Sequence, residues 1–191
     1  MDSIIIERMG GAGSITVQDL PSIIRAYYET PGMRSHLGPG GYDDPAADPD
    51  PDRITSADTR AANALAAHIR SDAWTTIVDA CGPLGWLRAL PADIDASLMP
   101  DDEWRAHRKA IGIAVGRLRR GRPMSAGITK VLHHKRPRLV PLVDALVREQ
   151  IGAPPDDRED TVEALLRIID HLVGQADRNR ATIQAALATR S

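Results

Sequence analysis

The chain has 191 residues, 42% of them apolar and 26% charged, which is the size and composition of a soluble globular domain with its own core. Its formal net charge of -2 is the sum of a strongly positive segment and an acidic remainder of the chain. The single cysteine, Cys81, excludes an intramolecular disulfide and a four-cysteine iron–sulfur cluster, and an aromatic content of 3% argues against a single-strand binder built on stacked bases.

The N-terminal part predicts little regular structure. A β-like run at residues 4–6 is followed by a glycine loop at 10–13 that lacks the context of a phosphate cradle, so we expect a flexible connector. Asp19 or Thr16 is placed to cap one helix that runs to Tyr28. The N-terminus is neither a signal peptide nor a membrane span, and no window reaches the length of a transmembrane helix, so a cytoplasmic protein is expected.

Three segments are expected: an N-terminal segment with one helix, a Pro/Asp-rich surface loop and a helical domain, at residues 1–37, 38–53 and 54–191. Prolines in the loop break the ligand spacing of a Ca²⁺ site, so no metal is expected there. Apolar periodicity then predicts helices at residues 55–69, 72–78, 84–90, 103–120, 125–134 and 141–151.

Local signals set the ends of these helices. Thr55 or Ser56, with Asp58, begins the first, and Pro141 opens the last because the N–H that proline lacks would be unpaired there. Gly112 and Gly116, four residues apart, predict a close helix crossing. Trp86 and Cys81 are expected in the core.

The C-terminal helices, at residues 158–190, begin with a capping-box-like Asp160 and Glu163. Gly174 is expected to end the first of them, and Asp177 to cap the second. No internal repeat and no period-2 strand pattern of any length is found. We therefore predict a single-domain, all-α protein without a metal or cofactor.

The charge distribution is uneven. Between Glu103 and Asp144 there is no acidic residue, but this interval contains 11 of the 24 Lys and Arg residues. The rest of the chain has 13 basic residues and all 26 Asp and Glu residues. Such segregation favours a polyanionic partner, and we expect nucleic acid to contact the basic segment at 104–143. The alternative is a solvated helix surface that pairs with the acidic parts of the same protein. The candidate binding residues are Arg117, Arg119, Arg120, Arg122, Lys130, His134, Lys135, Arg136 and Arg138.

Residues 140–148, VPLVDALVR, follow a basic helix and a Pro-containing turn. They resemble the segment after the hairpin in helix-hairpin-helix DNA glycosylases, in which a V-D-T-x-V-x-R pattern carries the catalytic aspartate. Residues 130–144, with 52–58, resemble more closely an actinobacterial family of unknown function, over roughly Tyr42 to Gly152. The first resemblance implies a glycosylase-like helical core, duplex DNA as partner and Asp144 as the catalytic residue, with Trp86 or Tyr42 stacking on an extruded base.

The chain departs from the glycosylase pattern in its hairpin. Glycines that would bring bare N–H groups to a phosphate are missing between Gly121 and Gly127, Ala145 replaces the Thr, and no Schiff-base lysine is present. Three functions therefore stay open: a monofunctional N-glycosylase, a non-catalytic DNA-binding module, and a small-molecule enzyme or resistance protein that holds a nucleoside or phosphate. For Asp144 the structural alternative is a helical ion pair with Arg148.

Overall fold

The N-terminus forms a β-hairpin. In this computed structural model, which describes residues 3–29, 42, 50–65, 67–81, 86–121, 125–155 and 161–188, β1 (Ile4–Glu7) pairs antiparallel with β2 (Ser14–Val17). The glycine loop between them is the turn, with Gly10, Gly11 and Gly13 in the left-handed region that glycine adopts without strain. The predicted strand-like run at 4–6 is thus confirmed, whereas the second strand, only four residues long, was missed.

The first half of the chain contributes three α-helices to the described part of the structure. The helix α1 (Leu20–Glu29) follows Asp19, whose carboxylate accepts a hydrogen bond from the Ser22 N–H, and α3 (Ser56–Ala64) is followed by α4 (Ser71–Cys81). Thr55 and Asp58 form the predicted capping box at the start of α3. The helix predicted at 84–90 is a 3-10 turn, η3 (Leu87–Ala89), in its described part, and a second such turn, η4 (Ala96–Leu98), follows.

The second half is helical: α5 (Asp101–Leu118), the 3-10 turn η5 (Arg119–Gly121), α6 (Ser125–Lys135), α7 (Ala145–Ile151), α8 (Val162–Arg178) and α9 (Arg180–Ala188). Two predicted boundaries are wrong here. Pro141 does not open a helix, because α7 begins only after Asp144. Gly174 does not end α8, which continues to Arg178, so Asp177 lies inside it. Thr161, not Asp160, caps α8; Asp160 lies outside the described residues.

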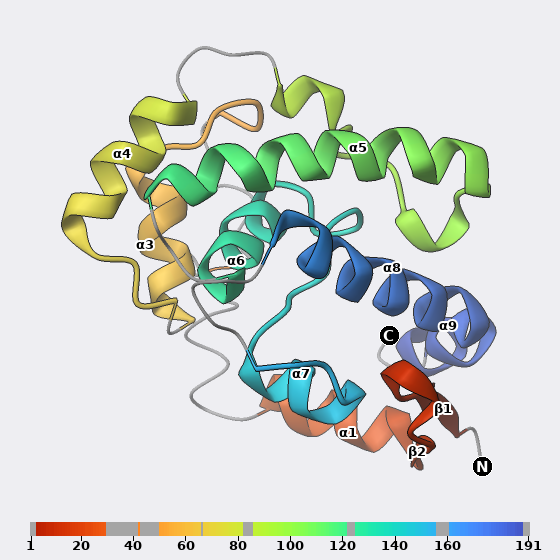
Figure 1. Cartoon of the computed structure of the whole chain (residues 1–191). Coiled ribbons are helices and arrows are strands. Elements are labelled where there is room, and N and C mark those ends of the chain that lie inside the picture. The colour runs from red at the N-terminus through yellow and green to blue at the C-terminus, as the bar shows by residue number, and fades with distance from the viewer. Residues whose placement is uncertain are drawn as a thin grey trace.

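Helix α6 lies in the middle of the fold, with α5 crossing it and α3, α4 and α8 around it (Figure 1). Eight of its 11 residues are buried. A Cβ added to Gly112 of α5 would come within 3.1 Å of Leu166 Cδ1 of α8, which confirms the predicted close crossing there, whereas Gly116 has open space. The described residues form one mostly helical unit, with the two short strands as the exception to the all-α prediction.

Candidate functional site

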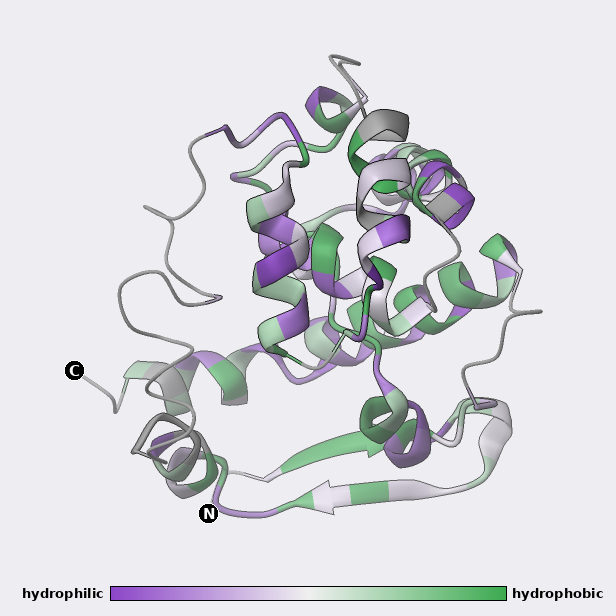
Figure 2. Ribbon diagram, turned by 90° about the vertical axis from the view of Figure 1, so that its left-hand side faces the viewer, coloured by the Kyte–Doolittle hydropathy of each residue, from purple (hydrophilic) through white to green (hydrophobic). Residues whose placement is uncertain are grey.

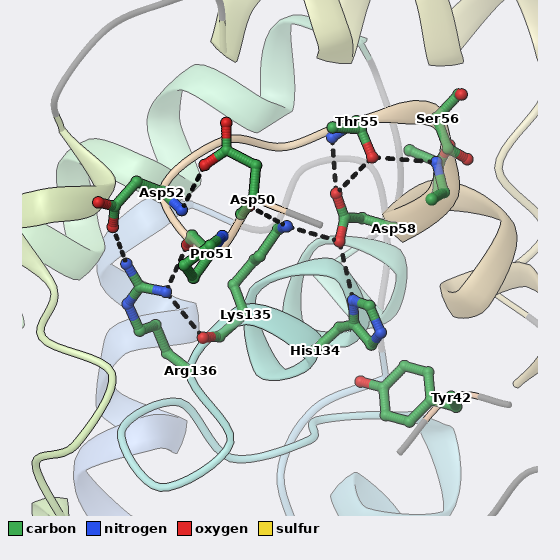
Figure 3. A network of polar contacts seen from close by, with 12 residues as sticks. Tyr42, Asp50, Pro51, Asp52, Thr55, Ser56, Asp58, His134, Lys135 and Arg136 are labelled. Carbon is green, nitrogen blue, oxygen red and sulfur yellow. Dashed lines mark hydrogen bonds and ion pairs between the residues drawn. The ribbon is translucent and has the colours of Figure 1, made fainter. Parts of the chain in front are cut away.

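Polar side chains of α6 tie it to several other segments (Figure 3). Helix α6 ends in His133, His134 and Lys135, and Arg136 follows. These residues face the loop at 50–58, η3 and the extended segment at 138–144. The α6 end of the basic run predicted to bind a polyanion therefore lies in the interior of the molecule.

Asp58 is the acidic centre of this network, and it is only 1% exposed. Its carboxylate accepts hydrogen bonds from the Thr55 N–H at 2.6 Å and from His134 Nδ1 at 2.8 Å, and it forms an ion pair with Lys135 Nζ at 2.9 Å. Burial raises the pKa of the Asp58 carboxyl, but the hydrogen bonds of His134, Thr55 and Lys135 and the charge of Lys135 outweigh it, so the pKa is lowered. Asp58 is thus an ionised carboxylate that neutralises a buried ammonium.

Arg136 closes a second part of the network. It is 1% exposed, and its guanidinium donates to the carbonyls of Leu87, Leu90, Pro51 and Lys135 and to the Asp52 carboxylate, which lies 3.0 Å from Nη2. The planar guanidinium presents five N–H donors, so it can join several carbonyl groups at one point. Arg136 therefore holds the 50–52 loop and η3 against the end of α6.

Lys130 and Tyr42 join α6 to the end of α3. Lys130 Nζ donates to the Leu65 carbonyl at 2.5 Å, and the Tyr42 hydroxyl donates to the Lys130 carbonyl at 2.6 Å. The Tyr42 ring stacks on His133, with 6.1 Å between the ring centroids. Since Lys130 is 6% exposed and Tyr42 4%, both belong to the interior.

Several predicted binding residues therefore occupy positions that do not fit surface contact. Lys130, Lys135 and Arg136 are buried, and the His134 side chain is 4% exposed. Most of their partners are carbonyls and carboxylates far away in the sequence. The absence of acidic residues near the basic run therefore did not show that its cations are paired. Tyr42 and Trp86, expected to stack on a base, are buried too, at 4% and 9% exposure.

Asp144 caps α7. Its Oδ1 accepts a hydrogen bond from the Val147 N–H at 3.0 Å, and its backbone is extended. The segment before it is fixed by α6: Thr129 Oγ1 lies 3.1 Å from the Val143 nitrogen and 3.2 Å from its oxygen, and His133 Nδ1 lies 2.7 Å from the Val140 carbonyl. Asp144 is half-buried and held in one position. The Arg148 expected beside it is buried and donates to the Pro154 carbonyl.

Other basic residues remain near the surface. Arg117, Arg119 and Arg120 lie close together at the end of α5 and in η5, Arg120 exposed and the other two half-buried. Arg138 is exposed in the turn after α6, and Arg122 lies outside the described residues. Near the start of α5, Arg108 pairs with Glu163 at 2.6 Å and with Asp170 at 2.8 Å, and these hydrogen bonds raise the pKa of Arg108 above its usual range.

Sequence reasoning missed Asp52 and Asp58 as partners of the basic run, and Thr129 as the residue that fixes Val143. The sequence did contain a signal for this pairing. Residues 52–58 and 130–144 resemble the same family, and the two segments carry opposite net charges. No group of three or more His, Cys, Asp or Glu that could hold a metal occurs among the described residues. In the same part of the chain, no helix combines the length and apolarity needed to cross a membrane.

Comparison with known proteins identifies a family for the chain. Neither a curated protein nor a solved structure is significantly similar to the chain. A family model does match, over residues 21–190, which is wider than the resemblance seen from the sequence. The chain therefore belongs to DUF6308, a family of unknown function.

Proposed function

We propose that the protein binds duplex nucleic acid through Arg117, Arg119 and Arg120, which we call the α5-end arginines. The observation that carries this proposal is their lack of acidic partners: within the described residues, no ion pair involves any of the three. Among the described residues, their one side-chain hydrogen bond is a long one, from Arg119 Nη2 to Ser125 Oγ at 3.4 Å.

The contrast with the other cations gives this observation its weight. Arg108, Lys135 and Arg136 each have a carboxylate from a distant part of the chain. Three arginines within four residues repel one another unless an anion lies between them, and arginine binds phosphate with two parallel hydrogen bonds. The Nε of Arg119 is buried without a hydrogen-bond partner among the described residues, so this guanidinium is not fully satisfied within the described part of the chain.

The position of these arginines supports a nucleic acid as the anion. They lie at the end of α5 and in η5, directly before Gly121, where the resemblance to helix-hairpin-helix proteins begins the hairpin that contacts the DNA backbone. Aromatic residues are scarce, and Trp86 and Tyr42 are buried, so base stacking contributes little and duplex is favoured over single strand.

Fluorescence anisotropy with a labelled duplex tests this proposal. The triple variant Arg117→Ala, Arg119→Ala, Arg120→Ala should weaken binding at low salt by at least about tenfold, as expected for the loss of phosphate contacts. The matched control is Arg105→Ala with Lys109→Ala, two exposed cations near the other end of α5. Equal loss in both variants, or no binding by the wild type, would contradict the proposal.

A second candidate function is hydrolysis of an N-glycosidic bond, with Asp144 as the catalytic residue. The observation that favours it is the fixed position of this carboxylate, which α6 sets through Thr129 and Val143. Such a carboxylate can stabilise the oxocarbenium-like sugar or activate water as the base leaves. The alternative is a purely structural role, in which Asp144 only caps α7.

Two substitutions separate these roles. Asn caps helices as well as Asp does, whereas Ala does not. Asp144→Asn should therefore keep the stability of the wild type but lose any release of damaged bases from duplex substrates, measured by strand cleavage after alkali. If the wild type releases no base from a broad panel of such substrates, or Asp144→Asn retains full activity, this candidate is wrong.

A further inference from the structure

The N-terminal hairpin has two outer edges, and the part of the chain that the structure describes closes one of them, the edge of β1. Asn179, at the end of α8, accepts from the Ile5 N–H at 3.1 Å and donates to the Ile5 carbonyl at 2.9 Å. The Glu7 carbonyl accepts from Gln175 Nε2 at 3.2 Å, and His171 Nε2 lies 2.7 Å from it. Side chains of the α8 end thus complete the hydrogen bonds of β1.

This contact fixes the direction of the β2 backbone groups. In an antiparallel pair, residues alternate between those that bond to the partner strand and those that point away from it. Ile5 points its N–H and C=O away from β2, and it pairs with Thr16. Thr16 must therefore point its own N–H and C=O away from β1, and Ser14, two residues before it, does the same.

The outer edge of β2 is open. No backbone hydrogen bond of Thr16 or Ser14 to a neighbouring segment occurs among the described residues, and both are exposed. Figure 2 shows β2 at the border of the molecule, with β1 between it and the helices. Natural sheets usually protect such an edge with a charged residue, a proline or a bulge. The strand Ser14–Val17, SITV, has no charge and no proline.

We propose that β2 pairs with β2 of a second copy of this chain, antiparallel about a twofold axis at Thr16, to form a four-stranded sheet. Around this axis Thr16 faces Thr16 of the other copy, and Ser14 faces Gln18. Ser14 and Thr16, the two residues of β2 on this row, point their backbone groups outward, so the edge offers donors and acceptors in self-complementary order. This dimer goes beyond the proposed function and does not depend on it.

The side chains favour a second copy over an unrelated strand. In the twofold register, Ile15 faces Val17 twice, and these two half-buried residues lie on the same face of the hairpin as the buried Ile4. Thr16 faces Thr16 on the other face, a favourable cross-strand pair. No like charges meet in this register, since residues 14–18 carry none. Every cross-strand contact of the self-pairing is therefore neutral or favourable.

A strand of four residues forms a small interface. Interfaces that bury less than about 1,200 Å² belong to weak, transient complexes, so we expect a micromolar dissociation constant. Analytical ultracentrifugation of the full chain over a wide concentration range should show a reversible monomer–dimer equilibrium. A wild type that stays monomeric at all concentrations would overturn the inference, whether or not another protein binds this edge.

Charge substitutions at the twofold axis give the sharpest test. Thr16→Lys puts two ammonium groups opposite each other, and Thr16→Glu puts two carboxylates there, so each should weaken dimerisation by at least about tenfold. An equimolar mixture of the two should restore a dimer, because Lys then faces Glu. A fold defect could not be rescued in this way.

The matched control is Ile5→Lys. Ile5 is exposed on the same face of the hairpin as Thr16 but lies on the closed strand β1, so this variant should dimerise like the wild type. Failure of the mixture to restore the dimer, or an equal effect of Ile5→Lys, would overturn the inference.

Discussion

The cations around α6 and the α5-end arginines come from one continuous basic segment of the sequence but occupy opposite environments. Lys135 and Arg136 are buried and bonded to Asp58 and Asp52, whereas Arg120 is exposed at the end of α5. A buried charge is stable only where partners replace its lost hydration. The difference teaches that a basic run has no single role: its position relative to distant carboxylates decides which residues hold the fold and which remain available to a ligand.

The largest expected effect is at Arg136. Arg136→Met removes the guanidinium hydrogen bonds to four carbonyls and to Asp52, and breaking a buried charged network costs about 3–5 kcal/mol. Urea denaturation followed by circular dichroism measures this loss of unfolding free energy. Arg138→Met, two residues away and exposed, is the control and should change it little. Similar losses in both variants would mean that the buried and exposed cations do not differ as described.

Asp58 gives the next largest effect, with a defined pH dependence. Asp58→Asn removes the carboxylate that lies 2.9 Å from the buried Lys135 ammonium, at a cost of about 3 kcal/mol. Because the pKa of Asp58 is lowered in the fold, its contribution is present above the unfolded pKa and is lost as the pH falls through the folded one. The difference in unfolding free energy between wild type and Asp58→Asn should thus be constant near neutrality and shrink below about pH 4. A difference that does not shrink would refute the ion-pair account.

Thr129 tests the link from α6 to the segment before Asp144. Thr129→Val keeps the side-chain volume but removes the hydroxyl that bonds the Val143 N–H and C=O. Leaving these buried groups unpaired should cost about 1–3 kcal/mol. Thr76→Val, on an exposed position of α4, is a control with the same change. Equal denaturation midpoints for both variants would show that Thr129 does not hold this segment.

Asp144 gives the smallest effect on stability. Asp144→Ala removes the cap of α7 and should cost about 1 kcal/mol, whereas Asp144→Asn should cost almost nothing. Thermal unfolding of the two variants side by side measures the difference. A large loss in Asp144→Asn would indicate that the charge of Asp144, beyond its capping oxygen, is part of the structure.

Local signals in the sequence predicted most of the helices but not how they meet. The Thr55 and Asp58 capping box and the α5 and α6 spans follow from periodicity and end residues, and the Gly112 crossing follows from small-residue spacing. The start of α7 was misplaced, because α6 side chains hold residues 140–143 extended, a tertiary effect without a local signal. The pairing of Asp58 with Lys135 spans 77 positions, so no local spacing rule applies to it.

The most direct test of the contrast between buried and available cations is the salt dependence of duplex binding. Each phosphate contact adds about 0.9 to the slope of log affinity against log salt, so three arginines should contribute a slope of about -2 to -3. We expect this slope in the wild type, and a nearly flat dependence after replacement of Arg117, Arg119 and Arg120 by Ala. An unchanged slope in the triple variant would show that other cations contact the nucleic acid and would contradict the account.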